Sequence, residues 1–378
     1  MGRSGFLSGS SCFMCARLLV LPLLLALAAP AQDTPIYPPS ASTSRDTAAS
    51  TSALRDAKSF ATPTVLGMGP SKGLIVRYER MPSFNVASTA QVVGLRDYRS
   101  EARKNARLSI KAYIPVWDHP HLKVIVGLSF EREEFQFQEL ATGYQLYDNI
   151  ENKGLNSIAT QLAVIRPVDE VHWYLARVKG ELAGDYNYEE LSKKDYLRVS
   201  AEAFYGWKRS PRFSWGLGFQ YGYTFGRLSF YPALIYNRTF NDRWGVEALF
   251  PARVLLRYNA SPTSVFYTGY SVDGLNYIIH LREPLIRQNQ PDKVALQILE
   301  LREIEVRYRL RWEHGLTGFL WLGAEAGYRH NYAFDAFDRT NADREKIIRS
   351  KLGGAPYASL ELFLAPPPKL LEKAGIRR

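Results

Sequence analysis

Cysteine is almost absent from this chain of 378 residues. The two cysteines, Cys12 and Cys15, both lie in the first 31 residues. The chain beyond residue 31 therefore forms no disulfide and no thiolate metal site. Both cysteines also precede the apolar core of that first segment, whereas the cysteine of a lipoprotein follows it, so we expect no lipid anchor.

Long apolar runs are also lacking. Beyond residue 31, no stretch approaches the ~18 apolar residues of a transmembrane helix. The run Leu18–Ala29 is only about a dozen residues long, follows Arg3 and Arg17, and ends at Ala29-Pro30-Ala31. Its length, positive flank and small residues predict a signal peptide over residues 1–31, removed after Sec-type export.

Acidic residues are outnumbered by basic ones. The net charge is +11, and +9 without Arg3 and Arg17. The arginines stand singly within alternating segments rather than in basic runs, and an exported protein rarely meets nucleic acid. We therefore expect no nucleic-acid partner and interpret the charge as part of a pore lining or of contacts with anionic lipid.

Composition divides the rest of the chain into three parts. Residues 32–60 are rich in Ser, Thr, Ala and Pro, which predicts a disordered leader. Residues 61–365 alternate strand-like segments with turn residues and form one domain. Residues 366–378 begin with three prolines, which end any strand, and continue as a basic tail that we expect in the periplasm.

Strict alternation of apolar and polar residues is the main structural signal. From Glu303 to Trp312, apolar residues alternate with charged ones over ten positions, which is typical of a two-sided β-strand. Similar alternation predicts strands at residues 108–114, 122–130, 197–207, 215–225 and 357–365. A chain that crosses a membrane with such strands must close into a barrel, because lipid leaves no partner for free backbone groups.

The connections alternate in length as well. Short links lie near residues 118–120, 167–170, 209–211, 241–243 and 313–315, and longer ones near 84–104, 135–155, 184–195, 283–298 and 331–354. Brief connections at Gly226-Arg227 and Asn259–Pro262 interrupt the sequence of long loops. This pattern predicts an all-β fold, an antiparallel up-and-down transmembrane β-barrel of about 12 to 14 strands. A hairpin at Asp273-Gly274 gives the favoured 14, whereas an unbroken strand from Ser264 to Leu281 gives 13.

From about Gly73 to Ala365 the chain resembles a family of bacterial outer-membrane barrel domains. The resemblance is carried by its glycine- and aromatic-rich strands, above all by Phe250-Pro251 to Tyr258 followed by Gly269 to Tyr277. These uncharacterised domains occur in Bacteroidota and related bacteria and are distantly similar to outer-membrane transporters. The segment Tyr357–Ala365 also resembles the closing strand that the barrel-assembly machinery recognises. The resemblance implies the fold and the outer membrane of a diderm bacterium, and it brings no catalytic residue.

Side chains of the expected barrel fall into two groups. One group is charged and is expected to line the lumen, where it either tunes solute selectivity or holds neighbouring strands together by ion pairing: Glu303, Glu305, Arg307, Arg309, Arg311, Glu325 and Arg329. The other group is aromatic and is expected at the lipid interfaces: Tyr205, Trp207, Trp215, Tyr221, Tyr223, Phe225, Tyr308 and Trp312.

The histidines provide little catalytic signal. His119 and His121 share a turn with Asp118 but lack a third metal ligand. A barrel phospholipase needs a serine two residues after its histidine, and His280 is followed there by Arg282 and His330 by Tyr332. The rim group His330, Asp335 and Asp338 matches a barrel protease only loosely. We therefore expect no catalytic residue, no cofactor and no metal.

We thus expect a non-enzymatic outer-membrane protein that passes small solutes through a charged lumen, with membrane lipid and the barrel-assembly machinery as partners. Two alternatives stay open. One is an outer-membrane hydrolase with a rim site in the long loops. The other is a secreted soluble β-sandwich that binds a ligand. Extraction behaviour and channel conductance distinguish the three.

Overall fold

The fold is described from a computed structural model of the chain. It describes residues 60–91, 95–138, 145–186, 194–285 and 295–365. The expected signal peptide, the tail and all but the last residue of the leader lie outside these ranges. Within them, no helix is long and apolar enough to cross a membrane.

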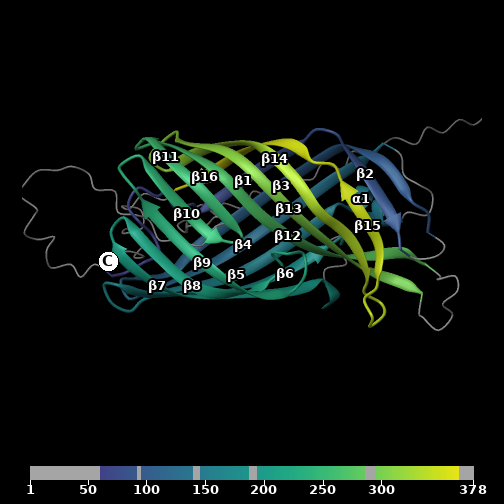
Figure 1. The fold of residues 1–378 in the computed structure, drawn as a ribbon, viewed down its shortest axis with the longest axis horizontal. Helices are drawn as coiled ribbons and strands as arrows, with labels where there is room; N and C mark the ends of the chain where they lie inside the picture. The colour runs from purple at the N-terminus through teal and green to yellow at the C-terminus, as the bar shows by residue number, and fades with distance from the viewer. Residues whose placement is uncertain (1–59, 92–94, 139–144, 187–193, 286–294, 366–378) are drawn as a thin grey trace, which may run out of the picture.

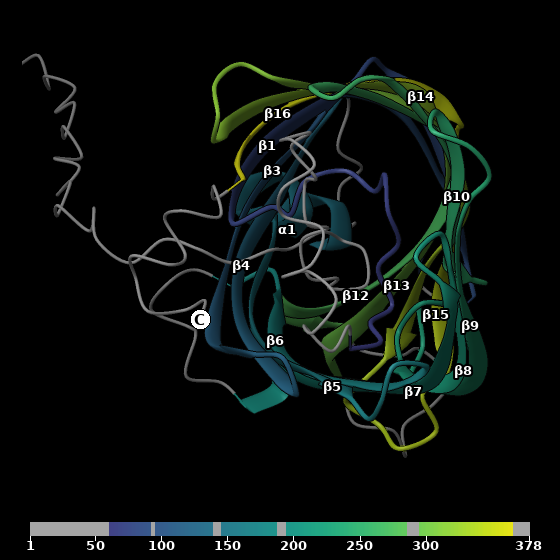
Figure 2. The ribbon, with the colours of Figure 1, turned by 90° about the vertical axis from the view of Figure 1, so that its left-hand side faces the viewer.

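Sixteen β-strand segments form one antiparallel sheet that closes on itself (Figures 1 and 2). The segments are β1 (Leu74–Met81), β2 (Phe84–Ala90), β3 (Tyr98–His119), β4 (Leu122–Phe137), β5 (Leu155–Pro167), β6 (His172–Gly184), β7 (Leu197–Ser210), β8 (Phe213–Gly222), β9 (Ser229–Thr239), β10 (Trp244–Phe250), β11 (Arg253–Ser261), β12 (Ser264–Leu285), β13 (Leu296–Gly315), β14 (Leu320–Asp338), β15 (Lys346–Leu352) and β16 (Ala355–Leu364).

The ring contains 14 strands, as the sequence predicts, because two strands are each interrupted once. β1 and β2 pair with β3 in nearly continuous register, and β15 and β16 both pair with β14. The first interruption lies at Pro82, which has no N–H to donate, and the second at Gly353-Gly354. β1 pairs with β16 and β2 with β15, so the first and last strands of the chain close the barrel.

Two predicted turns are misplaced, although the strand count is correct. β12 runs through Asp273-Gly274 without a turn and stays paired with β13 there. Gly274 serves close packing instead, because a Cβ on it would lie 1.9 Å from the backbone oxygen of Tyr223. The missing hairpin lies at Pro251-Ala252, between β10 and β11. The two errors cancel in the count.

The two ends of the barrel differ. At the turn end, links between consecutive strands are short, at residues 120–121, 168–171, 211–212, 240–243, 262–263 and 316–319. At the loop end, strands extend farther than the sequence predicts, since the expected loops 84–104 and 331–354 are largely occupied by β2, β15 and the ends of β3 and β14. β1 begins at the turn end, and β16 ends there.

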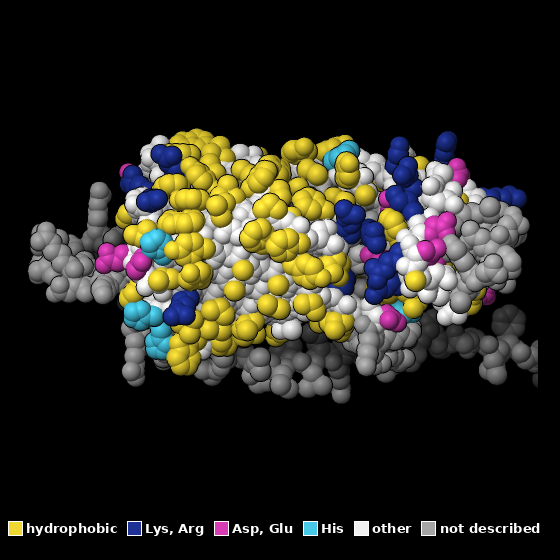
Figure 3. Space-filling model, turned by 60° about the horizontal axis from the view of Figure 1, so that its bottom comes forward, with side chains coloured by type: hydrophobic (Ala, Val, Ile, Leu, Met, Phe, Trp, Pro, Cys, Tyr) yellow, Lys and Arg dark blue, Asp and Glu magenta, His cyan; other side chains and the backbone are white. Residues whose placement is uncertain are grey.

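A broad apolar band covers the outer surface (Figure 3). Tyr308 and Leu310 of β13 are more than half exposed there, and Leu362 of β16 is about as exposed. Lys and Arg side chains gather beyond both edges of the band. Since large exposed apolar areas are rare on soluble monomers, this band marks a surface that is covered by something other than water.

The barrel narrows at its loop end. Strands β7 to β11 do not extend as far toward the loop end as the other strands. β12 bends over them there, until Ile278 pairs with Gly184 of β6. The backbone N–H of Asp185 also donates to the oxygen of Ile278 at 3.1 Å. At the loop end, the pairing of β12 with β6 therefore closes a smaller ring of strands, which continues from part of the wider 14-stranded ring. We call this smaller ring the upper ring.

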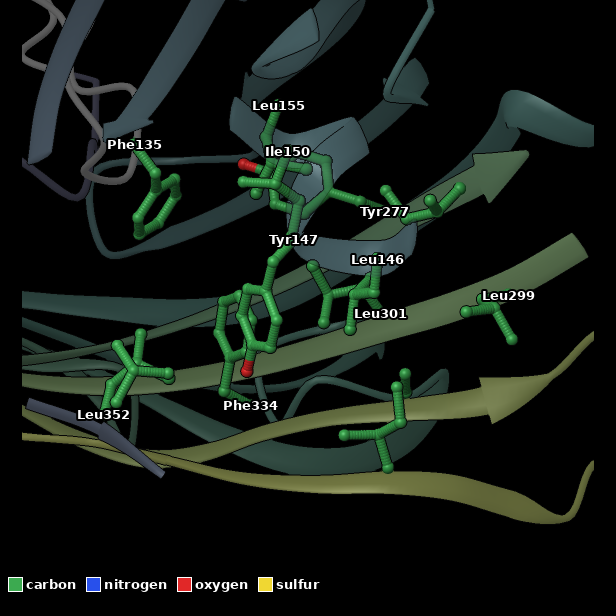
Figure 4. Packing of buried hydrophobic residues seen from close by; sticks show 14 of the residues in the cluster. Phe135, Leu146, Tyr147, Ile150, Leu155, Tyr277, Leu299, Leu301, Phe334 and Leu352 are labelled. Atoms are coloured by element: carbon green, nitrogen blue, oxygen red, sulfur yellow. The ribbon is translucent and has the colours of Figure 1, made fainter. Parts of the chain in front are cut away.

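Helix α1 (Gln145–Lys153) lies inside this upper ring (Figures 2 and 4). Its buried face carries Leu146, Tyr147 and Ile150, and it ends at Gly154, whose positive φ suits a helix C-terminus. The helix packs on apolar side chains from several strands, among them Phe135, Tyr277, Leu299, Leu301, Phe334 and Leu352. The loop end of the lumen is therefore filled by an apolar core.

The turn end is crossed by residues 60–72, which we call the inner segment (Figure 2). Its backbone bonds to two neighbouring turns: the N–H of Ala61 donates to Asp169 between β5 and β6, and the N–H of Leu66 donates to Pro211 between β7 and β8. At its other end, Lys72 reaches carboxylates of β13 and β16. Ala61 is fully buried in a second apolar cluster around Trp173 and Phe204. The inner segment thus lies across the turn end of the lumen.

Candidate functional site

A polar cavity of about 320 Å³ lies in the barrel interior. It is lined by side chains from most strands, with Leu249 and Ala252 among the few apolar ones. Nine of its lining side chains are Lys or Arg and five are Asp or Glu. Such a volume is at the lower end of the ~300–1,000 Å³ of ligand pockets.

One wall of the cavity is a dense network of ion pairs. On β13, Arg307 contacts Glu79 at 2.9 Å and Glu305 at 2.8 Å. Two cations from the beginning of the chain join it: Arg77 bonds Glu325 at 2.9 Å and Arg107 bonds Glu133 at 2.7 Å. Each cation holds carboxylates from more than one strand, so the network ties β1, β3, β4, β13 and β14 together.

Arg329 and Arg311 extend this network toward the two ends. Arg329 is fully buried, bonds Glu305 at 3.0 Å and lies 4.7 Å above the ring of Phe84. Arg311 bonds Glu313 at 2.7 Å and Glu361 at 2.5 Å. Lys72 of the inner segment reaches the same two carboxylates, at 2.6 and 2.8 Å.

The seven charged residues predicted to line the lumen are therefore brought together on the inner face of β13 and β14. Most of them are engaged with one another or with β1, β3 and β16. Glu303 is fully buried and accepts a hydrogen bond from Asn331 at 3.0 Å. Arg309 differs from the others, because its contact with the carboxylate of Glu325 is 3.8 Å long, and it also donates to Ser271.

The opposite wall is more open. Arg177 bonds Glu202 at 3.0 Å, and Lys179 contacts Glu181 at 3.2 Å. Arg198 on β7 reaches Glu181 only at 3.6 Å and stacks 5.2 Å above the ring of Tyr223. Around the ring, β7 lies six strands from β13, so the two walls face each other across the cavity.

Several of the predicted interface aromatics lie on the outer surface. Near the turn end, the ring of Tyr205 meets that of Trp207 edge to face at 4.8 Å, and Trp207 stacks on Trp215 at 4.5 Å. Tyr308 and Tyr221 are about half exposed. Trp312 stacks on Phe266 and His314. Phe225 lies in the loop after β8, with its ring 5.1 Å from that of Tyr231, which lines the cavity.

Tyr223 does not lie at a lipid interface. It follows the last residue of β8, where alternation no longer applies, and its side chain lies beneath Arg198 at the cavity. The loop that carries it packs on Gly274, and Asn276 donates to Gly226 in the same loop at 3.0 Å. The leaning β12 therefore draws this loop, and Tyr223 with it, against the cavity.

Sequence reasoning missed the cations that complete the network. Lys72, Arg77 and Arg107 lie in segments where alternation is weak or interrupted, and their partners are more than 190 residues away along the chain in most cases. The signal that exists is the pairing rule: β1 neighbours β16 in any closed barrel, so its charges meet those of the last strands.

Among the histidines of the described ranges, His172 contacts Asp169 at 2.7 Å in the turn between β5 and β6. His280 lies 4.0 Å from Asp185 and 3.9 Å from Asp195, beyond hydrogen-bond distance. Asp335 is paired with Lys346 at 2.7 Å, and Asp338 accepts bonds from the backbone of Thr340 and Asn341. No three His, Cys, Asp or Glu side chains of these ranges are grouped to hold a metal ion.

Comparison with known families matches the chain over residues 126–359, from β4 to β16, with the model of a family described as "Domain of unknown function (DUF6268)". The chain belongs to this family. The match confirms the expectation of an uncharacterised family. It includes β13 and β14 with their charged inner face and excludes the inner segment and β1 to β3.

Several solved structures resemble the DUF6268 chain. A FadL homologue of Pseudomonas aeruginosa is 9% identical, with a TM-score of 0.38, over 77% of this chain and 89% of that one. The COG4313 outer membrane channel of Pseudomonas putida F1 is 9% identical, with a TM-score of 0.38, over 79% and 97%. The P. putida toluene transporter TodX is 7% identical, with a TM-score of 0.36, over 79% and 91%. No curated protein matches the chain.

Proposed function

We propose that this protein is a non-enzymatic β-barrel of the bacterial outer membrane that passes small polar solutes through its interior. The observation that carries the proposal is the pairing of an apolar outer band with a polar, charged cavity inside the same closed ring. A barrel with lipid outside and water inside needs this inversion of the usual protein arrangement. A soluble β-sandwich buries its apolar side chains between its two sheets and would not show this inversion.

The orientation follows from the two ends. Outer-membrane barrels have short periplasmic turns and longer extracellular loops, so the turn end is assigned to the periplasm and α1 to the extracellular side. The signal peptide supplies export, and β16, which pairs with β1, is the strand offered to the barrel-assembly machinery. Membrane lipid contacts the apolar band.

Passage requires movement at both ends, because α1 fills the loop end and the inner segment crosses the turn end. The inner segment is held mainly by backbone and single side-chain hydrogen bonds, together with Lys72. α1 is held by an extensive apolar core. We therefore propose a channel that is closed at rest and opens when these elements move, in the sense of two populated states.

Three measurements test the proposal. The full chain is extracted from outer membranes, and its gel migration is compared before and after heating. The purified protein is then placed in planar bilayers beside a variant in which residues 61–71 are replaced by a Gly/Ser linker of equal length.

We expect detergent-dependent extraction, heat-modifiable migration, infrequent openings of the native protein and frequent openings of the variant. Water-soluble, heat-insensitive protein would contradict the membrane assignment. A barrel that is inserted in the bilayer, yet gives no channel events in either form at any voltage, would contradict the solute passage.

A further inference from the structure

The cations around the cavity are not balanced by the carboxylates that face it. Several acidic partners of the arginines, including Glu133, Glu305 and Glu325, sit in the wall and do not line the cavity. All three are nearly fully buried. The side of each pair that faces the cavity is therefore the guanidinium, and the space inside has a positive surface.

Two of these guanidinium groups are incompletely hydrogen-bonded. The Nε of Arg198 and the Nε of Arg309 are buried and have no hydrogen-bond partner, and both residues line the cavity. Arg198 is only 7% exposed. The protein therefore satisfies each of these planar cations only in part, and both cations border the space that a solute would enter.

The two donors belong to facing walls. Arg198 extends from β7 and is fixed between the rings of Tyr223 and Tyr277, at 5.2 and 5.8 Å. Arg309 extends from β13 and is fixed by Ser271. Stacking and hydrogen bonding limit the freedom of both guanidinium groups, so little entropy is lost when an anion binds to them.

We propose that the cavity binds a small organic acid that carries two anionic groups, one held by Arg198 and the other by Arg309. The modest volume of the cavity selects a compact solute, and the cations on opposite walls select anionic groups at both of its ends. Arginine suits this task because its planar donors match the geometry of carboxylate and phosphate. The inference rests on the proposed function and names the class of solute that the barrel passes.

The test compares three four-carbon probes of the same length: succinate, butane-1,4-diol and putrescine. Their binding to the full-length protein in detergent is measured by calorimetry after equilibration at 0.15 M NaCl, together with butyrate as a singly charged acid. We expect saturable binding of succinate, at least about tenfold weaker binding of butyrate, and no saturable binding of the diol or of putrescine.

Substitutions locate the site. Arg198→Gln and Arg309→Gln are each expected to weaken succinate binding by about tenfold or more. Arg212→Gln is the matched control, because Arg212 is half exposed in a turn and pairs with the exposed Asp242. If the glutamine variant at position 198 does not fold, Arg198→Lys replaces it, because lysine keeps the charge and removes the planar set of N–H donors. We expect Arg198→Lys to bind succinate more weakly than the native protein.

Equal binding of succinate and the diol, preference for putrescine, or unchanged affinity in both folded arginine variants would overturn the inference. These outcomes are separate from those of the proposed function. Channel openings without succinate binding would refute the anion site alone. Succinate binding without channel openings would leave the site and refute the passage of solute.

Discussion

At the residue scale, the interior of the barrel depends on arginines that bind several carboxylates at once. Arg329 is one example, since it is fully buried and contacts Glu305 at 3.0 Å and Glu133 at 3.9 Å. A buried pair gains little net stability over apolar residues of the same shape, yet the loss of one partner leaves the other charge uncompensated. The network is therefore sensitive to single substitutions.

The substitution Arg329→Gln tests this sensitivity. We expect it to lower the free energy of unfolding by ~3–5 kcal/mol, because Glu305 loses a buried partner. Urea unfolding in detergent, followed by tryptophan fluorescence, measures the change. Arg212→Gln, at an exposed pair, is expected to cost only ~0–1 kcal/mol. Similar losses for the two variants would contradict a structural role for the buried network.

Trp173 forms a tight apolar contact at the turn end. It is fully buried, donates from Nε1 to Ser214 at 3.0 Å, and packs against Gly206 and Gly216, where an added Cβ would lie 2.0 and 2.7 Å from its ring. The glycines on β7 and β8 thus leave the space that the indole fills. This contact explains two of the glycines within the predicted strands.

Gly206→Ala is expected to destabilise the barrel by ~1–3 kcal/mol, because the new methyl group overlaps the indole of Trp173. Gly180→Ala is the control, since a Cβ there meets no atom within 4 Å. The free energies of unfolding are compared in the native background and with Trp173→Leu. A penalty at position 206 that is unchanged with leucine at 173 would show that the indole is not its cause.

At the element scale, α1 is fixed by one polar anchor as well as by its apolar face. The Tyr147 hydroxyl lies 2.5 Å from the Ser88 hydroxyl and donates to Ser350 at 2.9 Å, and burial raises the pKa of Tyr147 to about 12 from an ordinary 10.0. Ser88 belongs to β2 and Ser350 to β15. The anchor therefore joins the helix to the first and last strands of the chain.

This anchor gives the docking of α1 a defined pH dependence. A phenol whose pKa is higher in the docked state contributes its full stabilisation below pH 10 and loses it progressively as the pH rises toward 12. We expect the protection of the α1 amides, which is their exchange rate relative to the intrinsic base-catalysed rate, to fall over this interval in the native protein and not in Tyr147→Phe. A similar fall in protection in both proteins would assign the change to another group.

The inner segment is the corresponding element at the turn end, and a covalent link tests its movement. The Ser214 hydroxyl donates to the backbone oxygen of Thr62 at 3.1 Å, so cysteines at these two positions are close enough for a disulfide or a short, reducible thiol-reactive crosslinker. The chain beyond residue 31 has no cysteine that interferes. We expect oxidation of Thr62→Cys/Ser214→Cys to suppress conductance and reduction to restore it. Equal conductance in both states would show that the passage avoids this segment.

At the scale of the whole molecule, the sequence predicts the type of fold and the number of strands because alternation and connection length are local properties. Its charged residues on β13 and β14 are also predicted, since strand periodicity places them on one face. Local signals do not reveal that β12 leans onto β6, that α1 enters the barrel, or that the inner segment crosses it. Each depends on contacts between distant parts of the chain, and Tyr223 was misassigned for that reason.

The two arginines at the centre of β13 are expected to differ in function. Arg307 is bound closely by Glu79 and Glu305, whereas the contact between Arg309 and Glu325 is 3.8 Å long. We expect Arg309→Glu to shift the anion-to-cation permeability ratio of open channels toward cations, and Arg307→Glu mainly to lower the stability of the barrel. The ratio is measured from reversal potentials in salt gradients. An unchanged ratio with Arg309→Glu would leave ion pairing as the role of both.

The ion pairs across the closing strands have a consequence for how the barrel is made. Lys72 and Arg77 lie at the beginning of the described chain, whereas their partners Glu313, Glu325 and Glu361 follow more than 200 residues later. Until the last strands pair with β1, the two cations lack these counter-charges. A chain truncated before β16 lacks Glu361, so Lys72 and Arg311 share one carboxylate fewer. Charge neutralisation thus coincides with completion, and it distinguishes a finished barrel from a fragment.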